Sequence, residues 1–189
     1  MRRNHFIALT AILILLTPFP CRALQSKRDP LTSEEIEQIR EATDRPAVRL
    51  KLYVGFIEAR ATRLEVLAKD PPSEQRADSI HDVLEEYTFL SDELQNNLDE
   101  YEAYETNKQR PVPDLRKALR DLQASFVLWK AAIQDPPPDK QYDFAREAAL
   151  DSTNSLTDQT KEMIVGQEAY FAQKKQDNKN QQNKGYVLP

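Results

Sequence analysis

Apolar side chains recur at alternating steps of four and three through the middle of the chain, over residues 73–109. The stripe has eight positions, of which six are apolar or aromatic: Ile80, Leu84, Tyr87, Ser91, Leu94, Leu98, Tyr101 and Glu105. No Gly or Pro interrupts it. This period is typical of an amphipathic helix, which at about 1.5 Å per residue is on the order of 50 Å long. Such a stripe is buried only against other long helices, so the pattern predicts helical hairpins.

Two helical patterns precede this stripe. The first begins at Thr32, because Thr32 and Glu35 fit a capping box that satisfies free backbone N–H groups at a helix start. It ends near Pro46, which suits the first turn of a following helix. That second helix runs to about Lys69, where a turn leads to Ser73 as a candidate N-cap of the long stripe. Its apolar residues lie on two faces, so we expect other helices to pack against both of them.

Two more helical patterns follow the stripe, separated by the proline-rich residues 135–139. The earlier one has the most regular apolar seam in the chain, formed by Leu115, Leu119, Leu122, Phe126, Trp129 and Ile133. The later one, residues 140–173, has small and hydroxylated residues on its inner face and is predicted to bury less apolar area. Among the most buried residues of the protein we expect Leu94, Leu98, Leu122, Phe126 and Trp129.

These patterns predict an all-α protein with a single folded domain over residues 24–173. We expect an antiparallel four-helix bundle of long helical hairpins, preceded by a short N-terminal helix, because short connectors favour antiparallel neighbours. Residues 174–184 contain no apolar residue and cannot bury enough surface to become ordered. Residues 174–189 are therefore predicted to form a disordered polar tail.

The first 23 residues have the pattern of a signal peptide. A positively charged start is followed by an apolar run at residues 6–16, too short to span a bilayer, and by a small residue, Ala23, at a suitable cleavage site. The pattern predicts export to the periplasm or the exterior, with no transmembrane helix after cleavage. Lipid attachment at Cys21 is less favoured, because Pro20 stands where that pathway prefers a small residue. Retention of the segment as an uncleaved anchor is the other alternative.

Removal of this segment leaves 23 basic residues against 31 acidic ones, a net charge of −8, and no cysteine. The acidic balance argues against nucleic acid as the main partner, and the lack of cysteine excludes disulfides and thiolate chemistry. His81 is then the only histidine, so the carboxylate–x–x–His pattern of Asp78 and His81 has no second copy. We therefore predict neither a metal site nor another cofactor.

No sequence pattern for catalysis stands out. The chain has no G-x-S-x-G nucleophile motif and no glycine-rich phosphate loop. The long charged helix faces and the polar tail are instead typical of a protein that contacts other proteins. The sequence predicts a non-enzymatic interaction or scaffold protein of the cell envelope or exterior, with a protein partner.

One surface has the composition of a binding site. Arg49, Tyr53, Phe56, Arg60 and Arg63 share one side of the second helix at steps of four and three. Arginine together with aromatic residues is typical of interface hot spots. The alternative function is therefore an envelope binding module that holds a small anionic ligand or glycan on this face.

A structural interpretation competes with this site. Residues 45–70 carry a net charge of +3 and residues 73–106 a net charge of −10, and helices joined by a short turn lie side by side. The acidic helix can therefore pair with the same arginines, while Tyr53 and Phe56 pack beneath the first helix. In that case no binding site remains on this face.

Overall fold

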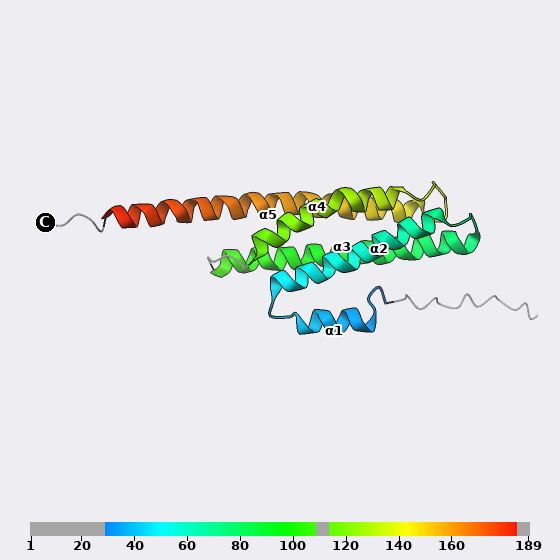
Figure 1. Ribbon diagram of the computed structural model, residues 1–189, viewed down its shortest axis with the longest axis horizontal. Helices are drawn as coiled ribbons and strands as arrows, with labels where there is room; N and C mark the ends of the chain where they lie inside the picture. The colour runs from blue at the N-terminus through cyan, green and yellow to red at the C-terminus, as the bar shows by residue number, and fades with distance from the viewer. Residues whose placement is uncertain (1–28, 109–113, 185–189) are drawn as a thin grey trace, which may run out of the picture.

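The computed structural model describes residues 29–108 and 114–184. These residues form five helices and no strand: α1 (Ser33–Glu41), α2 (Pro46–Lys69), α3 (Glu74–Lys108), α4 (Leu115–Gln134) and α5 (Asp143–Lys184) (Figure 1). The predicted all-α fold is confirmed. Within the described ranges, no helix is long and apolar enough to cross a lipid bilayer. The predicted signal peptide with Cys21, and residues 185–189 of the predicted tail, lie outside the described residues.

Capping groups and proline set the helix starts. Thr32 Oγ1 accepts a hydrogen bond from the Glu35 N–H at 3.2 Å, and the Glu35 carboxylate accepts one from the Thr32 N–H at 2.8 Å. Pro46 is the first residue of α2. The Ser73 hydroxyl accepts a hydrogen bond from the Arg76 N–H at 3.1 Å, where α3 begins. The predicted capping box, the proline start of α2 and the Ser73 cap are therefore confirmed.

Helices α2 and α3 form one hairpin, and α4 and α5 form a second hairpin that lies against it (Figure 1). Between the hairpins, α3 packs on α5 and α2 packs on α4. Partners along the α3–α5 contact advance together, from Tyr87 with Thr153 to Glu105 with Gln167, so these helices run in the same direction. Connectors fix the direction of consecutive helices, not which distant helices become neighbours.

The core lies between the two hairpins and contains an aromatic cluster where α3 and α4 approach. Trp129 meets Tyr87 edge to face, with ring centroids 6.2 Å apart, and meets Phe126 in the same way at 5.5 Å. The residues that the sequence places deepest are all at most 3% exposed, namely Leu94, Leu98, Leu122, Phe126 and Trp129. That prediction is confirmed.

Helix α5 is longer than the sequence predicts. Residues 174–184, assigned above to a disordered tail, continue the helix to Lys184, and Figure 1 shows this end (red) projecting beyond the other helices. The side chains of residues 172–180 are exposed. Extension of an existing helix adds one hydrogen bond for each residue fixed and needs no new nucleus, and no Gly or Pro intervenes before Gly185. An apolar face is therefore not required for these residues to be helical.

Candidate functional site

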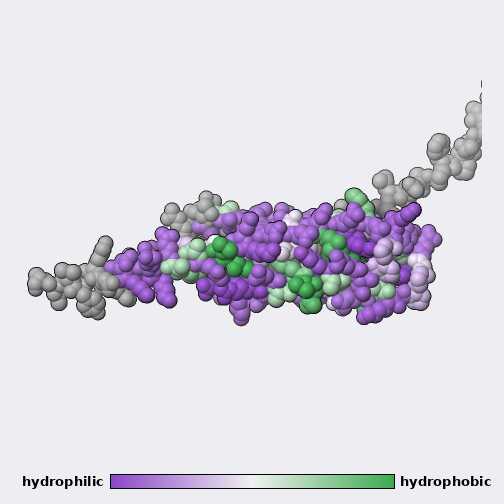
Figure 2. Space-filling model, turned by 90° about the horizontal axis from the view of Figure 1, so that it is seen from above, coloured by the Kyte–Doolittle hydropathy of each residue, from purple (hydrophilic) through white to green (hydrophobic). Residues whose placement is uncertain are grey.

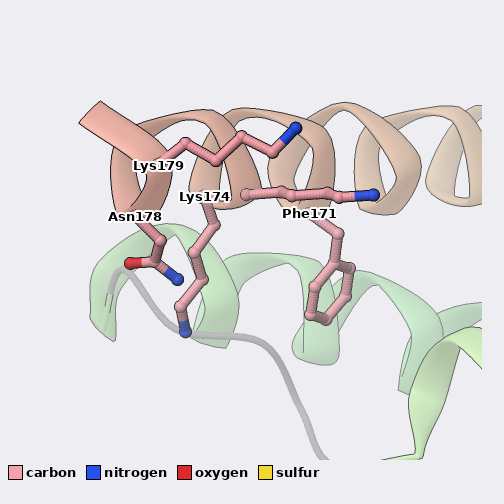
Figure 3. A pocket seen from close by; sticks show the side chains of 5 residues that line it. Phe171, Lys174, Asn178 and Lys179 are labelled. Carbon is pink, nitrogen blue, oxygen red and sulfur yellow. The ribbon is translucent and has the colours of Figure 1, made fainter. Parts of the chain in front are cut away.

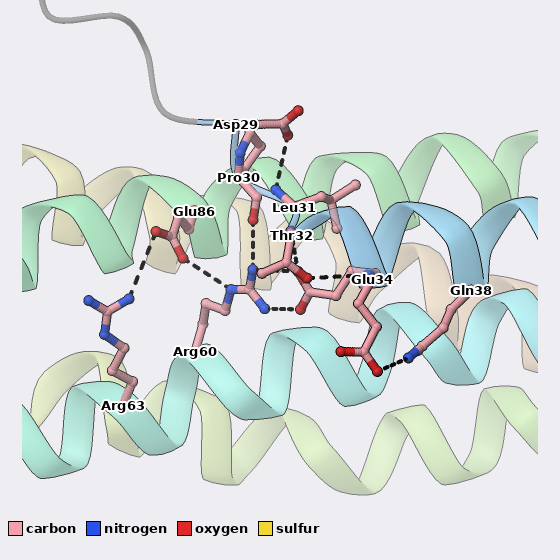
Figure 4. Close-up of polar contacts among 10 residues, drawn as sticks. Asp29, Pro30, Leu31, Thr32, Glu34, Gln38, Arg60, Arg63 and Glu86 are labelled. Atoms are coloured by element: carbon pink, nitrogen blue, oxygen red, sulfur yellow. Dashed lines mark hydrogen bonds and ion pairs between the residues drawn. The ribbon is translucent and has the colours of Figure 1, made fainter.

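Arg60 lies where α1, α2 and α3 meet (Figure 4). Its Nη2 donates to the Pro30 carbonyl at 2.7 Å and to Glu35 Oε2 at 2.9 Å, and its Nη1 donates to Glu35 Oε1. Its Nε donates to Glu86 Oε2 at 3.1 Å. The residue is only 8% exposed. Two carboxylates and a carbonyl therefore occupy the donors that an anionic ligand would use.

The positive charge of Arg60 and the negative charges of Glu35 and Glu86 stabilise one another. The hydrogen bond to Glu35 raises the pKa of Arg60 against the opposing effect of burial, and the charges of Glu35 and Glu86 add to the increase. For Glu35, burial acts to raise the pKa, but hydrogen bonds from Arg60 and from the Thr32 N–H outweigh it and hold the pKa below its ordinary value. Both groups are charged at neutral pH, so the cluster fastens α1 to α2 and α3.

The two aromatic members of the predicted face are part of the core. Tyr53 is 2% exposed and Phe56 is 8% exposed, and their rings meet edge to face with centroids 6.3 Å apart. Neither ring presents a wall to which a ligand could bind from solvent. Arg60 pairs with Glu86 of the acidic helix α3, and Tyr53 and Phe56 are buried, so this part of the face lacks the open surface that a ligand would need.

The two remaining members, Arg49 and Arg63, are more accessible but far apart. Arg63 has a side chain that is 48% exposed, and its Nη1 lies 3.9 Å from Glu86 Oε1. Arg49 is half-buried, and its charge acts to lower the pKa of Tyr101, which burial nevertheless raises to about 12. Fourteen residues separate the two arginines, or about 21 Å along a helix. One small anion cannot contact both.

A second site-like surface lies at the C-terminal end of α5, which the sequence assigned to the tail. A hollow of about 440 Å³ is lined by Phe171, Lys174, Lys175, Asn178 and Lys179 (Figure 3). All five residues belong to one helix, so the hollow is an open groove between their side chains. Arg116 of α4 stacks on the Phe171 ring at 4.6 Å, which anchors the base of this segment. The described side chains provide basic groups here but no second wall.

A third surface is apolar. Val127 and Leu128 of α4 are 75% and 69% exposed, and Phe144 and Val165 of α5 are 84% and 66% exposed. Figure 2, seen from above, shows hydrophobic residues (green) on this side of the molecule among hydrophilic ones (purple). These exposed apolar residues were not predicted from the sequence, where the buried seams give the stronger pattern. The spacing of apolar residues opposite the seam of α4 is the signal that would have revealed it.

In the part of the chain that the structure describes, no group of three or more His, Cys, Asp or Glu side chains is placed to hold a metal ion. His81 has Asp82 as its nearest acidic partner, with the Nδ1 and Oδ1 atoms 4.0 Å apart. Comparisons of the chain with protein-family models, with curated proteins and with solved structures find no match.

Proposed function

We propose that this protein is an exported, non-enzymatic interaction or scaffold protein of the cell envelope or exterior. The observation that carries the proposal is the set of large apolar side chains held outward on α4 and α5, from Val165 at 66% exposure to Phe144 at 84%. Single exposed apolar residues are ordinary. Four of the seven large apolar side chains exposed in the described residues belong to the neighbouring helices α4 and α5, and this concentration supports a protein contact surface there. Export is supported by the signal-peptide pattern of residues 1–23.

The scaffold that holds this surface is, in our proposal, a four-helix bundle of the α2–α3 and α4–α5 hairpins. Its support is the closed set of contacts that links α2 to α3, α3 to α5, α5 to α4 and α4 to α2. The interlocked aromatic core around Trp129 and the buried Arg60 cluster hold these helices in fixed positions. A rigid bundle presents its outer side chains without a cost for ordering them on binding.

Binding of a small anionic ligand or glycan at the Arg49–Arg63 face remains the alternative. Its support is the half-exposed Arg63 side chain, whose nearest carboxylate lies 3.9 Å away. The variant R63E retains the Arg60 cluster, so it should stay folded and lose any such ligand. The variant R60E leaves Glu35 and Glu86 facing a third carboxylate, so it should be destabilised whether or not a ligand binds.

Site-specific photocross-linking in the source cells tests the proposed function. A photoreactive residue replaces Phe144 or Val165, and the same residue replaces Asn96, an exposed polar position on α3, as the control. We expect a discrete protein cross-link from the two apolar positions and none from the control. Equal cross-linking at all three positions, or at none, would contradict a contact surface on this side of the molecule.

A further inference from the structure

We propose that the outer face of α4 is the contact surface of a homodimer, in which α4 of two copies pack antiparallel about a two-fold axis between Val127 and Leu128. This inference rests on the proposed function and deepens it, because it names a second copy of the chain as a partner.

The centre of the outer face is a narrow apolar strip. Ala124, Val127, Leu128 and Ala131 are all exposed and follow one another at i, i+3, i+4 and i+7, on the side of α4 opposite its buried seam. The strip covers two turns, about 10 Å along the helix. An alanine at each end leaves room for another helix to approach closely, while the two larger side chains occupy the middle.

The strip is self-complementary when two copies run in opposite directions. With the axis between Val127 and Leu128, each Val127 faces the Leu128 of the second copy, and each Ala124 faces Ala131. Every apolar position then meets an apolar position, as an isologous two-fold contact requires. The apolar strip alone does not exclude a parallel pair. The charged residues at its two ends distinguish the two directions.

Charge is distributed unequally along this face. Arg116, Lys117 and Arg120 are exposed at its N-terminal end, together with the acidic Asp114 and Asp121. Asp135 and Asp139 are exposed at and beyond its C-terminal end, followed by Lys140. The first turn of α4 has no acidic residue and the last turn has no basic residue. Apart from Asp114, the N-cap residue, these charges are opposite to what the helix dipole favours.

Antiparallel pairing of two copies does account for these charges. The register that matches the apolar strip places Arg120 opposite Asp135 at both ends of the contact, and Asp121 opposite the neutral Gln134. A parallel pair would instead place the basic ends together and the acidic ends together. The charges therefore select the antiparallel dimer and specify its register.

Arg120 is already positioned at the edge of the strip. Its Nη2 lies 2.8 Å from Glu168 of α5, and both side chains remain more than half exposed, at 55% and 53%. An exposed pair of this kind leaves other guanidinium donors free for a second carboxylate. Because one helix pair buries less than the roughly 800 Å² per partner of a standard interface, we expect dissociation in the range of about 1–100 μM.

Sedimentation of the purified full chain over a range of protein concentrations tests this inference. The wild type should change reversibly from monomer to dimer. The variants R120D and D135R should each dimerise at least about tenfold more weakly, because each places like charges together at both ends of the strip. An equimolar mixture of the two variants should dimerise as well as the wild type, since each copy then supplies the charges that the other lacks.

Matched variants separate the contact from folding and from nonspecific association. E168A removes the intramolecular partner of Arg120 and should not weaken the dimer. L128K should weaken it, whereas V66K, at a 56% exposed position on α2, should not. Circular dichroism of each variant checks that the helices remain folded. A wild type that stays monomeric, or a mixture of R120D and D135R that associates no better than either alone, would overturn the proposed dimer.

The outcomes also distinguish this inference from the function on which it rests. Cross-links from Phe144 to a different protein, in a chain that stays monomeric, would overturn the dimer and leave the interaction function in place. A charge-dependent dimer without any cross-link from Phe144 or Val165 would support the dimer and contradict the wider contact surface.

Discussion

Helices α4 and α5 belong to one hairpin but bury different chemistry. The seam of α4 is entirely apolar, and its residues are all at most 3% exposed: Leu115, Leu119, Leu122, Phe126, Trp129 and Ile133. The inner face of α5 includes several polar side chains that are at most 9% exposed: Ser152, Thr153, Thr157, Thr160 and Gln167. The same fold therefore contains one helix attached by apolar burial and one attached in part by hydrogen bonds.

The polar side chains of α5 reach α3. The hydroxyl groups of Thr153 and Tyr87 are hydrogen-bonded at 2.8 Å, and Ser152 donates to Asp92 Oδ1 at 2.7 Å. Thr153 also contacts its own helix, with its hydroxyl 2.6 Å from the Ala149 carbonyl. Apolar contact is non-directional, whereas a hydrogen bond is lost when a helix slides by one turn. We infer that α4 mainly supplies stability and that the hydrogen bonds of α5 mainly fix its register against α3.

The largest loss of stability is expected when the centre of the α4 seam is removed. Trp129→Ala deletes a side chain that is 1% exposed and contacts two aromatic rings, so it should lower the free energy of unfolding by about 3–5 kcal/mol. Urea denaturation measures the change. Val165→Ala, at a 66% exposed position on α5, is the control and should stay within about 0.5 kcal/mol of the wild type. Equal losses for the two variants would refute the assigned core.

Alkaline pH should selectively weaken the polar contact. Burial raises the pKa of Tyr87 to about 12, above the value of about 10 expected in the unfolded chain. The folded state therefore binds this proton more tightly than the unfolded chain does. The resulting contribution to the free energy of unfolding is complete below about pH 10 and is lost as the pH rises to about 12. The full loss is about 2–3 kcal/mol from Tyr87 alone.

Denaturation at a series of pH values tests this expectation. Tyr87→Phe should remove part of the loss of stability at alkaline pH. The remaining loss should come from Tyr101, because burial raises the pKa of that residue to about 12 as well. The double variant Y87F/Y101F should show the flattest profile. If stability of the wild type is constant over this range, neither hydroxyl is buried in solution.

A smaller loss of stability is expected when Thr153, the α5 partner of the hydrogen bond to Tyr87, is replaced. Thr153→Val keeps the shape of a fully buried side chain but leaves the Tyr87 hydroxyl without this partner, at a cost of about 1–3 kcal/mol. Adding Tyr87→Phe should recover part of that loss, because both partners are then apolar. Thr62→Val, at an exposed position of α2, is the matched control and should be near neutral. Strict additivity of T153V and Y87F would show that the two side chains do not interact.

The sequence allowed the helices and the α4 core to be predicted for physical reasons that are local. Thr32 with Glu35, and Ser73, satisfy the backbone at their own helix starts, and the seam through Trp129 repeats at the helical period. These signals depend only on residues a few positions apart. The all-helical fold and the buried positions followed from them.

What was missed depends on contacts between distant segments. The sequence places Arg60 on one face of a helix, but not the convergence of Glu35 and Glu86 on its guanidinium, since those residues are 25 and 26 positions away. The packing of α3 on α5 likewise depends on side-chain matching between the two helices, because no connector specifies which distant helices become neighbours. The exposed strip of α4 was readable, because Ala124 and Ala131 flank Val127 and Leu128 at helical spacing.

The smallest effect is expected where α5 leaves the other helices. The side chains of residues 174–180 are exposed, so removal of residues 174–189 should change the free energy of unfolding by less than about 0.5 kcal/mol. The truncated chain keeps Phe171, on which Arg116 stacks at 4.6 Å, and therefore keeps the last described contact between α4 and α5. Far-UV circular dichroism should nevertheless lose helical signal, because residues 174–184 are helical in the intact chain.

Temperature separates this end of α5 from the rest of the helix. Without tertiary contacts, a polar helical segment unwinds gradually, so the difference spectrum between the full and truncated chains should fade well below the cooperative transition. The transition itself should stay at the same temperature in both chains. A truncated chain that melts substantially earlier would show that the projecting segment packs against the protein, and the contrast between the two ends of α5 would then be wrong.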